Sequence, residues 1–376
     1  MNISKKISLI SAALATLASG VACAQTSAGN VSLYGVLDEF VGHQQAVVAG
    51  KDTSLTYLGN SSELTSRWGL RGDEDLGDGY KTKFDLEQGF DPSTGVQQNS
   101  YRMFDRQAWV GISGSFGELR AGRQNTPFFT WSGNLDAFSA ATYGSGYNNF
   151  SQWLARIDND ISYKLPKFYN TDTEFHYSVG GIAGNSSASA AYQGAIQTTQ
   201  GPFYGNMVYL HVNNITNTAS VQQFMTGGNY DYGMGKVYLG FFRTNDVISA
   251  TGGNALANPA GKYNPTTGPV GPIAGNYHNT YSLSADYRFS AQTTVGGGYA
   301  AIKDQSALGN NAKEFSLIAN YDLSKHTRLY AVASRIDNTN TANFKLTGAS
   351  ITAGTILTPD KGQNETGFQV GIQFMF

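Results

Sequence analysis

The chain has 376 residues, only 14% of them charged, and its 25 Lys and Arg against 27 Asp and Glu give a net charge of −2. Soluble domains usually carry about 25% charged residues, and a nucleic-acid-binding protein needs a basic surface, so both classes are disfavoured. Glycine is frequent, with 45 residues, and 22 Tyr and 21 Phe stand against 9 Pro. This mixture favours short strands and turns over helices.

The first 24 residues have the three parts of a secretory signal peptide. Lys5 and Lys6 precede a short apolar stretch, residues 7–21, and Ala22-Cys23-Ala24 supplies a small-residue cleavage pattern. We expect cleavage after Ala24, which divides the chain into a signal peptide, 1–24, and a mature domain, 25–376. The only cysteine would leave with the signal peptide, so the mature chain has no disulfide framework.

After the signal peptide no apolar run approaches 18 residues, so the sequence contains no candidate transmembrane helix. A chain that still spans a membrane must do so as a closed barrel, because lipid cannot satisfy the open edges of a sheet. Such a barrel is recognised by period-two alternation in segments of about ten residues. Several segments show it, with apolar and aromatic residues on one face and polar residues on the other: 157–165, 175–179, 277–289 and 313–323.

Short and long connections alternate along the chain. Short Gly-rich or polar links occur at 72–79, 113–117 and 232–235, and long polar segments occur at 124–155, 248–276 and 337–363. Short turns at one rim and long loops at the other are the arrangement of outer-membrane barrels. We therefore predict an all-β protein, a transmembrane antiparallel β-barrel of about sixteen strands, located in the outer membrane.

The last segment of the chain alternates most sharply. Its apolar positions are Phe368, Val370, Ile372, Phe374 and Phe376. A soluble protein would need a partner sheet to cover such a face. The segment resembles the C-terminal strand with a final Phe that the outer-membrane assembly machinery recognises, and we interpret these five residues as an assembly signal.

Five short motifs occur in order in the first third of the mature chain. They are VSLYGVLD at 31–38, SRWGLRGDEDLG at 66–77, FDLEQGF at 84–90, RQAWVG at 106–111, and FGEL with AGRQ at 116–119 and 121–124. These motifs are similar to the first strands of the general porins of β-proteobacteria. The resemblance is dense over residues 31–127 and at the C-terminus, whereas the middle and late strands match mainly in pattern.

The resemblance implies a homotrimer of sixteen-stranded barrels, each a water-filled channel for passive diffusion of small hydrophilic solutes and ions. It also implies a third extracellular loop folded into the lumen, and residues 124–155 stand where that loop belongs. A structureless loop of this length would otherwise count against the assignment. The implied partners are outer-membrane lipid, lipopolysaccharide and the assembly machinery; no cofactor and no enzyme activity are expected.

The resemblance also supplies candidate pore residues. A basic wall at the constriction maps onto Arg67, Arg106 and Arg156, with Arg123 at the start of the loop as a further candidate, and Glu87 and Asp136 map onto the acidic side. Alternation along the strands adds other lumen charges, namely Arg71, Lys81, Lys83 and Asp85. Inward charges at a narrow point set the field that ions experience, so arginines without equal acids predict a preference for anions.

Other interpretations stay open at this stage. Each arginine could instead be a solvated wall residue or could hold the loop by an ion pair. Family members usually place basic residues between the final aromatic residues, where this chain has Gln373 and Met375, so the charge of that inner wall is in question. The acidic turn 73–78 is read as a hydrated turn, because the spacing of a Ca²⁺ loop is missing, and no metal site is predicted.

Two rival functions remain. A substrate-specific channel for an organic acid or a sugar could use the aromatic residues in or near the loop, Tyr143, Tyr147, Phe150 and Trp153, although packing of the loop against the wall is the favoured role for them. A barrel enzyme or an adhesin is more remote. The sequence has no Gly-x-Ser-x-Gly elbow to supply a nucleophile.

Overall fold

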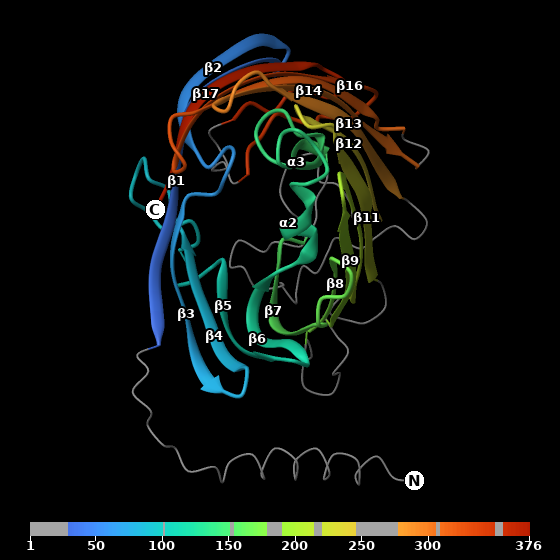
Figure 1. Ribbon diagram of the computed structural model, residues 1–376. Helices are drawn as coiled ribbons and strands as arrows, with labels where there is room; N and C mark the ends of the chain where they lie inside the picture. Colours follow the sequence, from blue (N-terminus) through green and yellow to red (C-terminus); the bar gives the residue numbers. More distant parts are fainter. Residues whose placement is uncertain are drawn as a thin grey trace.

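The computed structural model of the protein describes residues 29–100, 102–150, 154–178, 190–213, 220–245, 277–305, 309–349 and 356–376. The predicted signal peptide, 1–24, lies outside these residues. The described strands form a single antiparallel sheet that curves round and closes on itself (Figure 1). Within the described part of the chain, no helix has the length and apolar character needed to cross a bilayer.

The strands of the barrel follow one another in chain order. They are β1 (Asn30–Val48), β2 (Lys51–Asn60), β3 (Arg67–Gly77), β4 (Tyr80–Gly89), β5 (Gln107–Gly114), β6 (Gly117–Asn125), β7 (Arg156–Lys164), β8 (Thr171–Ser178), β9 (Ala191–Gln200), β10 (Phe203–Asn213), β11 (Ser220–Asp231), β12 (Lys236–Thr244), β13 (His278–Arg288), β14 (Thr293–Asp304), β15 (Ala312–Asp322), β16 (Thr327–Asn338) and β17 (Glu365–Met375). Each strand from β3 onward pairs with the next along the chain, as in an up-and-down barrel.

The 17 strands of the described residues make a sixteen-stranded wall. Strand β1 pairs with β3 through its first part, 30–36, and with β2 through its second part, 39–48. On its other side β1 pairs with β17, so β2 and β3 occupy one position in the wall. The break between them is the segment 61–66. The prediction of an antiparallel barrel with about sixteen strands is confirmed.

The barrel closes where β17 meets β1. The register runs from Val36 opposite Met375 to Ala46 opposite Glu365. Gly35 and Phe376 extend the ladder by two more backbone hydrogen bonds, of 3.0 and 3.1 Å. The apolar residues of the predicted assembly signal share the outer face of β17 and are all exposed.

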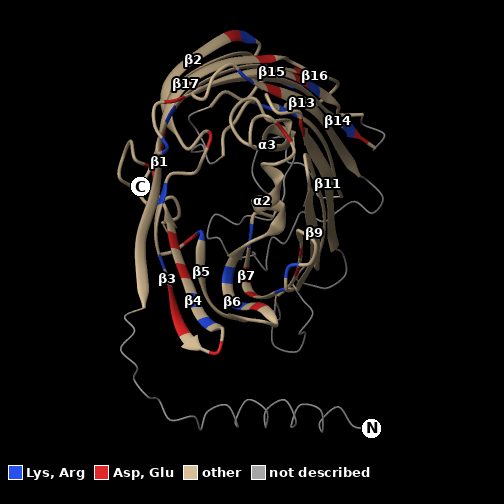
Figure 2. Ribbon diagram, viewed as in Figure 1, with Lys and Arg blue, Asp and Glu red and all other residues tan. Residues whose placement is uncertain are grey.

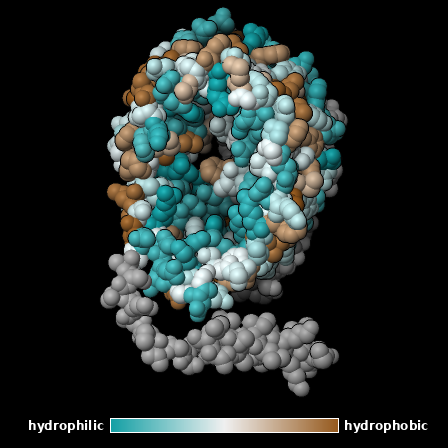
Figure 3. Space-filling view, viewed as in Figure 1, coloured by the Kyte–Doolittle hydropathy of each residue, from teal (hydrophilic) through white to brown (hydrophobic). Residues whose placement is uncertain are grey.

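The two faces of the wall differ as the alternation predicted. On β13 and β15 the outward residues are Tyr281, Leu283, Phe315 and Leu317, while the inward Ser282, Ser284 and Ser316 are buried. In the space-filling view apolar surface lies on the outer flanks and polar surface surrounds the central opening (Figure 3). In β7 the alternation is broken at Asn159, which has a φ of 52°, and Ile157 is consequently buried inside the barrel although Ile161 faces outward.

The long connection after β6 lies inside the ring of strands, where α2 (Pro127–Ser132) and α3 (Gly146–Phe150) are visible in Figure 1. We call residues 126–150 the inner loop. Several hydrogen bonds join it to the wall; among them, the Ala137 amide donates to Ser284 Oγ (2.9 Å), the Tyr143 amide to Gln369 Oε1 (3.0 Å) and the Asn149 side chain to Glu314 Oε2 (3.0 Å).

Apolar packing fixes the inner loop against one half of the barrel. One cluster joins Phe128, Trp131 and Tyr147 to inward residues of β10, β11 and β12, and a second joins Phe138, Tyr143 and Phe150 to inward residues of β14, β15 and β16. Tyr143, Tyr147 and Phe150 have no exposed surface, which confirms the packing role that was favoured for them. Trp153 lies outside the described residues.

Glycines in the wall make room for the large side chains of the inner loop. A Cβ atom at Gly240 of β12 would lie 1.6 Å from the Tyr147 hydroxyl oxygen, whereas one at Gly194 of β9 would have its nearest neighbour at 3.8 Å. Both glycines lie within strands, so the two positions differ mainly in the space available.

The first prediction concerns this fit. Gly240→Ala should displace Tyr147 and loosen the inner loop, at a cost of about 1 to 3 kcal/mol, the range typical of overpacking. Hydrogen exchange followed by mass spectrometry should show faster exchange of amides 140–150. Gly194→Ala is the matched control and should leave that exchange unchanged; equal behaviour of the two variants would contradict the packing described above.

Candidate functional site

A cavity of about 960 Å³ lies between the inner loop and the wall made by β1, β3, β4 and β5. Its strand side carries charged side chains, from Arg67, Arg71, Asp85, Glu87, Arg106 and Arg156. Its opposite side is formed by uncharged residues of the inner loop, Thr130, Ser132, Gly133 and 139–141, and by 347–349. Charged residues of β3 and β4 are visible in Figure 2. The segment 63–65 also lines the cavity and adds the carboxylate of Glu63, whereas the inner-loop residues that line it are uncharged.

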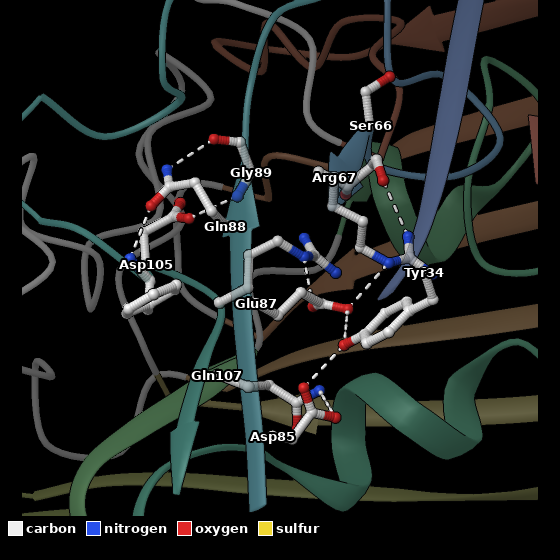
Figure 4. A network of polar contacts seen from close by, with 12 residues as sticks. Tyr34, Ser66, Arg67, Asp85, Glu87, Gln88, Gly89, Asp105 and Gln107 are labelled. Atoms are coloured by element: carbon white, nitrogen blue, oxygen red, sulfur yellow. Dashed lines mark hydrogen bonds and ion pairs between the residues drawn. The ribbon is translucent and has the colours of Figure 1, made fainter. Parts of the chain in front are cut away.

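Glu87 is the centre of the charged side (Figure 4). Its Oε1 lies 2.6 Å from Nε of Arg106, and its Oε2 lies 3.0 Å from Nε of Arg67. Arg67 also donates from Nη1 to the Thr65 carbonyl at 2.8 Å. Neighbouring strands β3 and β4 bring Arg67 and Glu87 to the same face, and Arg106 immediately precedes β5. One carboxylate thus serves two arginines.

Tyr34 connects Glu87 to the next charge along the wall. Its hydroxyl lies 2.7 Å from Asp85 Oδ1 and 3.0 Å from Glu87 Oε2, and with a single proton it donates to one of them at a time. The guanidinium carbon of Arg71 lies 4.8 Å from the centre of the Tyr34 ring. Arg71 and Asp85 both line the cavity, so a positive and a negative charge lie beside Tyr34.

Arg156 lies at the same cavity but is surrounded differently. Within the described residues no acidic oxygen lies within 4 Å of its side-chain nitrogens, and its buried Nε has no hydrogen-bond partner there. Its guanidinium carbon lies 5.0 Å from the ring centre of Phe129, and that of Arg106 lies 5.8 Å from the same ring. Phe129 was not among the predicted pore residues, because nothing in the sequence places one residue of a loop opposite two strand residues.

The segment 61–66 also reaches the cavity. The Asp38 carboxylate accepts hydrogen bonds from the Glu63 and Leu64 amides, at 2.8 and 2.7 Å. The Ser62 carbonyl accepts from the Thr142 amide of the inner loop and from the Ala349 amide, both at 2.9 Å. The segment thereby joins the inner loop and residues 347–349. This inward segment was not predicted, although the polar run Asn60-Ser61-Ser62-Glu63 could have indicated a break in the strand.

Glu63 is the charged residue of this segment. Burial raises its pKa, and the attraction of Arg328, whose Nη1 lies 2.9 Å from Glu63 Oε1, acts in the opposite direction. Because Arg328 also holds Asp322 at 2.6 Å, this arginine connects the inward segment to β15 and β16. Glu63 therefore shares its cation with Asp322, and its carboxylate is one of the acidic groups that line the cavity.

Arg123 does not join the group at the cavity. It lies opposite Ala108 in the pairing of β5 and β6, and the same face continues through Ala121 to the exposed Val110. Its Nη1 lies 2.6 Å from Asp158 Oδ1, which Arg102 also contacts at 2.6 Å. The structure therefore places Arg123 on the outer face in an ion-pair cluster, because the residues after β4 cover the wall there.

Asp136 is likewise away from the cavity. It is 3% exposed, and its carboxylate accepts hydrogen bonds from the Phe138 and Ala140 amides, at 3.0 and 2.7 Å, and from the Ser145 hydroxyl. Burial raises its pKa to about 6, although these hydrogen bonds act in the opposite direction. Asp136 therefore stabilises the inner loop through hydrogen bonds within that loop. The resemblance had implied a position on the acidic side of the pore constriction.

The two predicted lumen lysines lie further along β4, outside the lining of the cavity. Lys83 is paired with Glu118 at 2.6 Å, and Lys81 with Asp73 at 3.4 Å. Glu118 also contacts Arg120, so one carboxylate serves two cations here as well. Among the described residues, no cluster of His, Cys, Asp and Glu side chains is arranged to hold a metal ion.

Comparison with known proteins agrees with this geometry. The family model for Gram-negative porins matches residues 11–341. An outer membrane porin of Bordetella pertussis is 30% identical over 89% of this chain and 94% of its own length. Outer membrane porin protein 32 of Delftia acidovorans is 29% identical over 97% of this chain and 98% of its own length.

Solved structures give the same result. An anion-selective porin from Comamonas acidovorans superposes with a TM-score of 0.73 at 26% identity, covering 93% of this chain and all of that one. The outer membrane protein OmpT of Vibrio cholerae, in a trimer form, shares the fold with a TM-score of 0.63 at 15% identity, covering 93% of this chain and 99% of that one. The chain belongs to the Gram-negative porin family, whose members are channels of the outer membrane and not enzymes.

The second prediction tests the role of Glu87 in holding the charged wall together. Glu87→Gln should lower the free energy of unfolding in detergent micelles by about 3 kcal/mol, because it leaves buried arginines without their anion. A guanidinium chloride titration followed by Trp fluorescence measures this change. The control is Glu118→Gln at the more exposed pair, with an expected loss of about 1 kcal/mol or less; equal losses would contradict the central position of Glu87.

Proposed function

We propose that this porin is a passive diffusion channel that prefers small hydrophilic anions, and that Arg67, Arg106 and Arg156 set the preference. The observation that carries the proposal is the charge balance at the cavity, where Glu87 is paired with Arg67 and Arg106 and where Arg156 has no acidic oxygen within 4 Å among the described residues. Arg71 and Asp85 add one charge of each sign to the lining, and Arg328 is shared by Glu63 and Asp322. The charged side chains that line the cavity are thus four arginines and three carboxylates, so a net positive charge of about one remains at the narrow part of the lumen.

The position of this charge supports the same conclusion. The opposite side of the cavity is formed by uncharged residues of the inner loop, so no acidic wall offsets the arginines. A charged, narrow and partly water-excluding passage raises the local concentration of counter-ions. The similar porin from Comamonas acidovorans is described as anion-selective, which is consistent with the proposal.

The third prediction is a reversal-potential measurement. Purified protein is inserted into a planar lipid bilayer under a salt gradient. The conductance should rise in groups of three equal steps, one for each channel of a trimer, and the reversal potential should show that anions are more permeable than cations. Arg67→Ala and Arg106→Ala should each lower the ratio of anion to cation permeability, by about two- to tenfold if each guanidinium contributes about 0.5 to 1.5 kcal/mol to the barrier for cations.

The matched control is Arg335→Ala. Arg335 is paired with Asp337 at 2.7 Å and lies away from the cavity, so its removal should leave the permeability ratio unchanged. Cation-preferring wild-type channels would overturn the proposed role of the arginines, while the assignment to the porin family would stand.

We also propose how the protein reaches and occupies the membrane. Residues 1–24 act as a cleaved signal peptide, and the outward apolar face of β17 presents Phe368, Val370, Ile372, Phe374 and Phe376 to the assembly machinery. The exposed apolar band then contacts outer-membrane lipid and lipopolysaccharide. Three copies assemble into a homotrimer, a proposal supported by the trimer form of the structurally similar Vibrio cholerae protein.

The fourth prediction concerns export. The mature protein isolated from outer membranes should begin at Gln25, because signal peptidase cleaves after a small-residue pattern such as Ala22-Cys23-Ala24. N-terminal sequencing or intact mass measurement of the purified protein tests this. A mature protein that retains Lys5 and Lys6 would contradict the assignment of the signal peptide.

A further inference from the structure

We infer that Phe129 is a positioning residue of the pore, and that its ring holds the guanidinium group of Arg156, together with that of Arg106, against the cavity. The inference rests on the proposed anion preference and names a residue that determines its strength.

The short helix α2 places Phe129 opposite its own anchoring face. Thr126 caps the helix: its Oγ1 accepts from the Phe129 amide at 3.3 Å and donates to the Leu154 carbonyl at 2.6 Å. Phe128 and Trp131 are three residues apart, so they lie on one side of the helix, where both are buried. The Phe128 ring meets the Phe242 ring of β12 at 5.9 Å.

Phe129 follows Phe128 by one residue and is therefore turned by about 100° around the helix axis. Its side chain is only partly buried and lines the cavity together with Arg106 and Arg156. Both guanidinium carbons lie within 6 Å of the ring centre, at 5.8 and 5.0 Å, which is the range of cation–π attraction. The face of an aromatic ring attracts a cation without cancelling its charge, unlike a carboxylate.

Arg106 and Arg156 depend on this ring to different degrees. Arg106 is also fixed by Glu87 at 2.6 Å. Arg156 has no ion pair among the described residues, and its Nε has no hydrogen-bond acceptor there, so the ring of Phe129 is the contact that holds its guanidinium group. Without the ring, Arg156 is free to turn toward Glu87, where its charge would be neutralised, or away from the cavity.

The experiment compares Phe129→Leu with the wild-type protein in planar bilayers under a salt gradient. Leucine keeps an apolar side chain but removes the face of the ring. We therefore expect the ratio of anion to cation permeability to fall about two- to fivefold, which corresponds to the loss of one exposed cation–π contact. Phe129→Tyr retains the ring and should retain the ratio. If Phe129 only supported the fold, the permeability ratio would not differ between Phe129→Leu and Phe129→Tyr.

Phe128→Leu is the matched control on the anchoring face of α2. It should disturb the packing of the loop without lowering the permeability ratio, so an equal fall in Phe128→Leu and Phe129→Leu would overturn the inference. A second test is the double variant Phe129→Leu with Arg156→Ala. If the ring acts through Arg156, the double variant should differ little from Arg156→Ala alone; additive effects would overturn the inference.

The outcomes separate this inference from the proposed function. If wild-type channels show no anion preference, or if Arg106→Ala leaves the ratio unchanged, the proposed function itself fails. If wild-type channels prefer anions and Arg106→Ala lowers the ratio, but Phe129→Leu leaves it at the wild-type value, the proposed function stands and the positioning role of Phe129 is overturned.

Discussion

Peptide groups in the wall of this barrel must find their hydrogen-bond partners within the protein, because the lipid around it offers none. The pairing of β1 with β17 meets this requirement by joining the two ends of the sheet. Strand β1 is the longest of the described strands because it has β17 on one side and both β2 and β3 on the other. The same arrangement releases residues 61–66 from the wall, and the Asp38 carboxylate of β1 then holds their amides inside the barrel. Closure of the barrel and the shape of its lumen thus depend on one strand.

Closure also explains why the lumen has two unlike sides. A closed wall has an inner face that needs no contact with lipid, so its residues are free to be apolar or charged. On β10 to β16 many inward residues are apolar and pack against the inner loop, as in the contact between Phe128 and Phe242. On β3, β4 and the start of β5 they are charged and face water. The inner loop separates the apolar half of the lumen from the charged half, and ions can pass only along the charged half.

The sequence was sufficient for the fold and for the centre of the site. Alternation along the strands and the order of the motifs predicted a sixteen-stranded barrel, and the same alternation placed Arg67, Arg71, Asp85 and Glu87 on one inward face. Short-range rules suffice for these residues because they lie in regular, neighbouring strands. The side of the wall on which a residue lies follows from its parity as long as the strand is unbroken.

The same rules failed where the backbone departs from regular pairing. The bulge near Asn159 changes the register between β6 and β7, and the residues after β4 fold over the outer face, so Arg123 and Asp158 meet outside the barrel. Asp136 lies in a loop, where a carboxylate can satisfy nearby amides as easily as it can face a pore. Phe129 was not predicted because its importance arises from a contact between α2 and strand residues distant in the sequence.

The inner loop has a consequence for how such a channel can change. Its anchoring side chains, Phe128 and Trp131 among them, are buried against the wall, whereas Phe129 and Thr130 border the water-filled space. Adjacent residues of one short helix therefore have different roles: one packs against the wall of the barrel, and the other contacts the solutes that pass. Substitutions on the water side can retune which solutes pass while the protein continues to fold and assemble, so a bacterium can adapt the permeability of its surface to a new nutrient or toxin by single, tolerated steps.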